Sequence, residues 1–408
     1  MVLQRVLNSA GIDVRSCAEL LGFNPDMFAQ WAANPSQIPQ SVVPLLSAVL
    51  SVPQSLFATS PKAAKNLKDS DVTPQIWYKF RGDGLQESDR EYVVLIRQIG
   101  HFLNELEEAT RQKSVQWKSL FESIRSSADI QAPPTEQGKM AARIFRQSTA
   151  VSQGATGSGN VLRGLLRSLG VLVVESPLAN SRIEGCCFYV GSTNSPRPCV
   201  FANSHHTTWF RRNVILTHEV GHAIFEHLAG ASLDFSGVGI SQDSLELRAQ
   251  AFAQETLIPK EVLFHAAQSR GIKWPALNEY AVACLVADTH VEQKLVVSAA
   301  IDYGFIEAER QDELNNLEIH GELLKLSDHA LSTEQFLEKT GENASDWIGK
   351  RTTTLSPRAI RLPIGYVNAV VDAYKNRQIS PAKAAEYLIV DEQEFTERFG
   401  DIYENVEC

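Results

Sequence analysis

Two stretches decide how this chain folds around its chemistry: RRNVILTHEVGHAIFEH (residues 211–227) and ELRAQAFAQETLIP (residues 246–259). The first contains His218-Glu219-x-x-His222. On a helix, positions four residues apart lie on one face with about 6 Å between them, so both imidazoles can reach one tetrahedral metal ion. Glu219 lies beside them and can accept a proton from water without being a ligand itself. The apolar residues around the motif predict that this helix is buried.

A catalytic metal site needs a third protein ligand, and Glu246 is the best candidate because it begins the second predicted helix. The small and apolar residues that follow it at helical spacing would face the first helix, which is a gluzincin-like layout. Gln250 lies on the same face and is predicted to hydrogen-bond a ligand. Asp243 and Glu255 are competing third ligands. His227 is too close to the paired histidines on the same helix to complete a tetrahedron.

The composition limits the class of protein. The chain has 408 residues, of which 44% are hydrophobic and 21% charged, and this excludes a largely disordered chain. A net charge of −10 disfavours binding of nucleic acid or an anionic membrane by the chain as a whole. No apolar run suits a signal peptide or a membrane span. The six cysteines form no CxxC pair, which is typical of reduced thiols. We therefore expect a cytoplasmic, multidomain protein.

The residue pattern predicts a mostly helical α+β fold with a small sheet. Short runs rich in branched and aromatic residues predict strands at 171–175, 186–190 and 199–203, and helices are expected at 214–228, 245–257, 276–287 and 291–303. Residues 60–74 are predicted to be a linker and residues 152–160 a loop. The expected domains are a helical unit (1–60), a helical segment (75–135) that ends at Pro133 and Pro134, a metallopeptidase domain (136–306), a helical connector (307–360) and a C-terminal helical unit (361–408).

The two ends of the chain carry a related pattern. The stretch CAELLGFNPDMFAQW (residues 17–31) and its neighbours predict short helices that resemble a helix-turn-helix domain of the xenobiotic-response-element repressor type. The C-terminal stretch SPAKAAEYLIVDEQEFTERF (residues 380–399) repeats this template. Ala385, Glu386, Leu388 and Phe395 stand where Ala18, Glu19, Leu21 and Phe28 do. DNA contacts need basic and polar side chains, but residues 24–31 contain no Lys or Arg. We therefore expect both units to contact proteins, either a substrate or a second copy of the chain.

The two opening stretches together resemble the ImmA/IrrE family of metallopeptidases. That family couples an H-E-x-x-H helix to a downstream E-x-x-A-N-x-F-A-x-x-L-x-P helix, and Gln250 occupies the Asn position here. The resemblance extends to about residue 306. It implies a zinc-dependent endopeptidase that cleaves a helix-turn-helix repressor and so relieves repression, in a stress response or in mobile-element induction. Two imidazoles and a carboxylate also suit Mn²⁺ or Fe²⁺.

The donor that would stabilise an oxyanion cannot be chosen from the sequence. The candidates near the motif are His205, His206, Arg211 and His227. Asn203 closes the third predicted strand and is a candidate for docking a peptide along the sheet edge. Two other functions stay open: a helix-turn-helix regulator that binds DNA, and a non-catalytic interaction module with a vestigial metal site.

Overall fold

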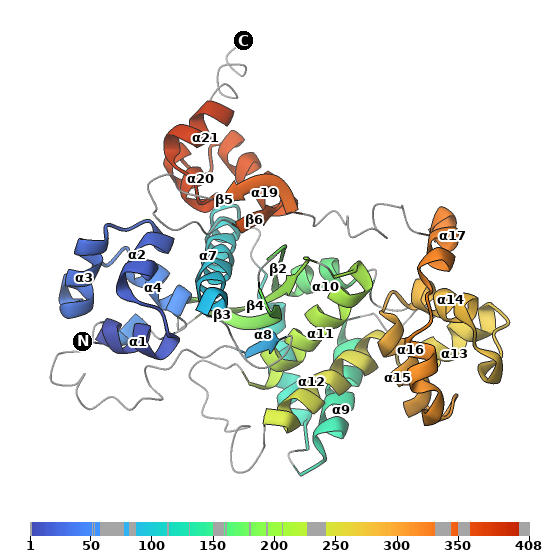
Figure 1. The fold of residues 1–408 in the computed structure, drawn as a ribbon. Helices are drawn as coiled ribbons and strands as arrows, with labels where there is room; N and C mark the ends of the chain where they lie inside the picture. The colour runs from blue at the N-terminus through green and yellow to red at the C-terminus, as the bar shows by residue number, and fades with distance from the viewer. Residues whose placement is uncertain are drawn as a thin grey trace.

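The computed structural model describes residues 2–50, 52, 54–57, 77–80, 87–111, 114–129, 131–149, 159, 161–178, 181–192, 195–205, 207–226, 242–330, 344–349 and 360–399. The fold is mostly helical with a small central sheet (Figure 1), which confirms the predicted α+β class. The predicted linker at 60–74, and all of the predicted loop at 152–160 except Gly159, lie outside the described residues. No helix in the described part combines the length and apolar character that a membrane crossing requires.

The central sheet has four strands in the order β1-β3-β4-β2. Their bounds are β1 Trp77–Phe80, β2 Leu172–Ser176, β3 Ile183–Ser192 and β4 Ser195–Asn203. β2 runs parallel to β4, and the other pairs are antiparallel. The three predicted strands correspond to β2, β3 and β4, with β3 and β4 longer than expected. β1 is an additional strand from the segment that we expected to be helical.

Helices cover both faces of the sheet. Helix α7 (Glu87–Ala109) lies against one face and α11 (Trp209–Phe225) against the other. Side chains alternate between faces along a strand, so Cys186 joins the core on the α7 side, whereas the neighbouring Cys187 joins the core on the α11 side. A Cβ at Gly100 of α7 would lie 3.0 Å from the Sγ of Cys199 on β4, so glycine allows this helix to approach the sheet closely.

The N-terminal and C-terminal helical units both pack against α7 (Figure 1). The N-terminal unit contains α1 Val2–Ala10, α2 Val14–Leu21, α3 Pro25–Ala33, η1 Pro35–Gln37, α4 Val43–Leu50 and η2 Gln54–Leu56. The C-terminal unit contains α19 Ile364–Lys375, α20 Pro381–Tyr387 and α21 Glu392–Phe399. Buried Arg97 of α7 donates a hydrogen bond to the Val49 carbonyl at the end of α4. Lys383 of α20 lies 2.9 Å from Glu105 of α7. Both units therefore share one helix as their support.

The terminal units have corresponding caps. The Asp13 side chain accepts hydrogen bonds from the first turn of α2, and the Ser380 side chain does so for α20. Gly22 after α2 has a φ of 73°, and Ile389 after α20 has a φ of 55°. The left-handed region strains a β-branched residue such as isoleucine far more than it strains glycine. The C-terminal unit therefore has the same left-handed turn as the N-terminal unit, although isoleucine is an unfavourable residue at this position.

The remaining helices lie on the side of the sheet away from α7. They are α8 Gln116–Ser127, α9 Pro134–Ser148, α10 Leu162–Leu169, α12 Gln242–Leu257, α13 Lys260–Ser269, η5 Trp274–Ala276, α14 Glu279–Thr289, α15 Gln293–Asp302, η6 Ala308–Arg310, α16 Gln311–Asn315 and α17 His320–Ala330. Helices α8 and α12 contact α11, and α9 makes its most extensive packing contact with α12. The sequence-based reading did not predict α9 or α13, whereas α8 lies in the segment expected to be helical.

Two expectations about organisation differ from the structure. Pro133 and Pro134 do not end a helical region but precede and open α9, because proline suits the first position of a helix. The domain boundary expected after residue 135 therefore falls inside this helix. The segment 307–360 was expected to be helical throughout, but among its described residues Ala344–Gly349 (β5) pairs with Ile360–Pro363 (β6) in a separate two-stranded sheet. This pairing joins residues too distant for a local pattern to indicate.

Candidate metal centre

Helix α11 is buried along nearly its whole length. Thr208 caps its N-terminus by accepting a hydrogen bond from the backbone N–H of Arg211, and every residue from 212 to 225 is buried. The helix begins earlier than the predicted residue 214 and ends before residue 228, at Phe225. A helix enclosed on all sides presents its polar residues to a sealed interior, where they must meet partners or a ligand.

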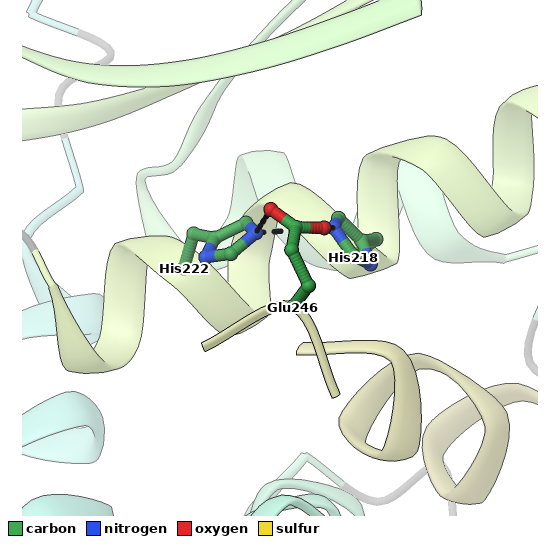
Figure 2. A group of neighbouring side chains, drawn as sticks. All are labelled: His218, His222 and Glu246. Atoms are coloured by element: carbon green, nitrogen blue, oxygen red, sulfur yellow. Dashed lines mark hydrogen bonds and ion pairs between the residues drawn. The ribbon is translucent and has the colours of Figure 1, made fainter. Parts of the chain in front are cut away.

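Three side chains from α11 and α12 converge, two of them buried and the third, Glu246, 38% exposed (Figure 2). The Nε2 atoms of His218 and His222 are 3.0 Å apart. Glu246 places Oε2 at 3.1 Å from the first ring and Oε1 at 3.3 Å from the second. Because α12 begins at Gln242, Glu246 lies in its second turn and not at the helix start expected from the sequence.

These donors fit a tetrahedral divalent ion. Two ligand atoms about 2.0 Å from such an ion lie about 3.3 Å from each other, which is close to the separations found here. Among the described residues, His218, His222 and Glu246 form the group whose ligand atoms lie within 4.8 Å of one another. The alternative ligand Glu255 instead pairs with Arg143 at 2.9 Å. The side chain of Asp243, the other alternative, lies outside the described part.

The pKa values of His222 and Glu246 depend on the contacts between these side chains. Burial by itself lowers the pKa of His222, but hydrogen bonds with Glu226 and Glu246 outweigh burial and raise the pKa to about 10. Burial alone would raise the pKa of Glu246, yet its hydrogen bonds with His218 and His222 hold that pKa well below its usual value. The centre thus keeps a carboxylate ionised against two imidazoles, and a divalent cation would take the place of the imidazole protons.

Glu219 lies beside the triad and is fully buried. It faces Gly185 of β3, where a Cβ would come within 2.9 Å of Oε1 of Glu219 and within 2.4 Å of Cγ2 of Ile215. Glycine at this position leaves the space that the carboxylate occupies. The sequence-based reading did not identify Gly185, because glycine within a strand often marks a close approach but does not say of what.

Two of the other predicted site residues have local partners, and one is exposed. The Asn203 amide donates hydrogen bonds to the carbonyls of Leu178 and Ile183. Its oxygen accepts from the backbone N–H of Leu178 and of His205. This side chain therefore fastens the β2–β3 connection. His205 is partly buried. Gln250 is exposed, and its side chain has no hydrogen bond to another described residue.

Arg211 is held by two carboxylates. Its guanidinium pairs with Glu184 of β3 at 2.7 Å and with Glu292 before α15. Burial lowers its pKa, but these two acids outweigh burial and raise it. Arg211 therefore links α11 to the sheet and to α15. His206 and His227 lie outside the described residues.

A buried helix with two histidines one turn apart, a glutamate supplied by a second helix and a further acid beside them define the class of metal-dependent peptidase domains. Residues 166–284 match the family model Peptidase_M78, described as the IrrE N-terminal-like domain. This segment is thus similar to the metallopeptidase domains of the ImmA/IrrE type, in agreement with the resemblance found in the sequence. Comparisons with curated proteins and with solved structures gave no match.

Proposed function

We propose that this protein is a metal-dependent endopeptidase with His218, His222 and Glu246 as ligands and Glu219 as general base. The observation that carries the proposal is the convergence of three donor groups at 3.0–3.3 Å next to a buried carboxylate that is not part of the triad. Zn²⁺ suits this donor set and geometry, and Mn²⁺ or Fe²⁺ is also compatible.

The metal ligands and Glu219 have different roles in the proposed reaction. A bound divalent ion would polarise the scissile carbonyl and lower the pKa of the attacking water toward about 7. Glu219 accepts a proton from that water and passes it to the leaving amine. Its side chain is buried beside the triad, close to where that water would bind. Gly185 keeps space for the carboxylate beside β3.

We propose a transcriptional repressor of the helix-turn-helix type as the substrate, because ImmA/IrrE-type peptidases are associated with such partners. Helix α3 of the N-terminal unit contains no Lys or Arg, and Met27 on it is partly exposed. Such a surface favours contact with protein over contact with DNA. An electrophoretic shift assay at low salt should show no specific DNA binding by the full chain.

The decisive test is Glu219→Gln. The variant should retain about one metal ion per chain, measured by elemental analysis, and should lose cleavage of repressors encoded beside its own gene. Glu246→Gln should lose both the metal and the activity. Glu261→Gln, on the exposed surface of α13, is the matched control and should retain both. Parent-like cleavage by the Glu219 variant would overturn the mechanism.

A further inference from the structure

We propose that Glu226 is a positioning residue that fixes the ring of His222 for metal binding and is itself held by Arg248. This inference rests on the proposed ligand role of His222. Glu226 directly follows α11, and its backbone N–H donates to the His222 carbonyl at 2.8 Å. Its side chain is only 4% exposed, and Oε2 lies 3.2 Å from Nδ1 of His222.

The contact decides which ring nitrogen faces the metal. A carboxylate can only accept a hydrogen bond, so Nδ1 of His222 must carry the proton in this pair. In the neutral ring, which is the form that binds a metal ion, Nε2 then carries the lone pair and faces His218 and Glu246. A carboxylate that orients a ligand in this way also increases the basicity of the ring.

Arg248 holds the carboxylate from the other side. Oε1 of Glu226 accepts a hydrogen bond from Nη2 of Arg248. The Arg248 side chain is buried, donates from Nη1 to Oε1 of Gln137 at 3.0 Å, and lies over the Phe225 ring at 4.4 Å. Each oxygen of Glu226 therefore has its own partner, one to orient the ring and one to fix the carboxylate.

Two unfavourable contributions to the free energy of folding arise from the position of Glu226. A negative charge at the C-terminal end of a helix is unfavourable, because the carbonyl dipoles there are also negative. A buried carboxylate adds a desolvation cost. Arg248 offsets both costs, and it does so from α12, two residues after Glu246. The helix that supplies the third ligand thus also fixes the orientation of the second.

The test compares two Glu→Gln variants. Glu226→Gln keeps the shape of the side chain but weakens acceptance from Nδ1 and leaves Arg248 without its counter-charge. Glu255→Gln is the matched control, because Glu255 lies on α12, also forms an ion pair with an arginine, Arg143 of α9, and contacts no member of the triad. Chelator competition with Zn²⁺ should show a roughly 10–100-fold loss of affinity for Glu226→Gln and parent-like affinity for Glu255→Gln.

A second readout is the visible spectrum of the Co²⁺-loaded protein, which depends on ligand geometry. It should change for Glu226→Gln and not for Glu255→Gln. If Glu226→Gln does not fold by circular dichroism, Arg248→Lys replaces it with the same two readouts, and a loss of affinity is again expected. Parent-like Zn²⁺ affinity in a folded variant would overturn the inference. A parent chain that binds no Zn²⁺ would instead refute the proposed function.

Discussion

The crossing of α9 and α12 depends on a single glycine. A Cβ at Gly138 would lie 2.2 Å from the backbone oxygen of Arg248 and 2.9 Å from the backbone nitrogen of Phe252. Backbone atoms cannot rotate away as a side chain can, so Gly138→Ala must push the helices apart. Gly164 in α10 is the matched control, because a Cβ there would meet nothing within 4 Å.

The two substitutions should have opposite signs. Within a helix, replacing glycine by alanine stabilises by about 1 kcal/mol through helix propensity. Forcing an extra carbon into a packed interface costs about 1–3 kcal/mol or more. The contact at Gly138 is more than an ångström too short, so the upper part of that range applies. We expect Gly138→Ala to lose roughly 1–2 kcal/mol net and Gly164→Ala to gain up to about 1 kcal/mol.

Thermal unfolding followed by far-UV circular dichroism measures both variants. A change of 1 kcal/mol corresponds to roughly 2–4 °C in Tm for a domain of this size. The Gly138 variant should melt a few degrees below the parent and should also bind Zn²⁺ more weakly, because α12 carries Glu246. A Gly138 variant that melts at or above the parent would show that the two helices do not cross as closely as described.

Three further outcomes are expected. Burial raises the pKa of Glu105, but hydrogen bonds with His101 and Lys383 outweigh it and set the pKa at about 2. The stability that Glu105 contributes is thus complete above its unfolded pKa near 4.5 and is lost as the pH falls toward 2. Glu105→Gln should flatten the decline in Tm across that range. Asp13→Ala removes the cap of α2 and should cost about 1 kcal/mol in denaturant titrations. Adding a chelator to the Zn²⁺-loaded chain should lower Tm, by an amount equivalent to about 2.7 kcal/mol where free Zn²⁺ had been 100 times Kd. His222→Ala should show no such response.

The sequence was most informative where the chemistry is local. The i, i+4 spacing of His218 and His222 needs only one helix to become a ligand pair, so it could be recognised without knowledge of the fold. Glu246 could be selected because the apolar residues after it implied a helix that packs on the first. The class of fold followed from the branched runs that became β2, β3 and β4.

The sequence was least informative where residues far apart meet. Helix α11 has buried residues on all its sides, polar ones among them, so no amphipathic face indicated that it packs against the sheet. The partners of Glu226 and Arg248 depend on how α11 and α12 cross, and two charged residues in a sequence do not reveal a shared buried bond. β1 pairs with β3 across about a hundred residues of intervening chain, a distance at which no periodicity connects two strands.

The position of α7 has a consequence for attempts to isolate the peptidase. The segment that matches the family, residues 166–284, includes α11 but not α7. Cut out alone, it would expose to water one whole side of its sheet, including Val174, Phe188 and Phe201. A continuous apolar surface of this kind promotes aggregation. A truncated chain that contains this domain and does not aggregate must therefore begin upstream of Glu87.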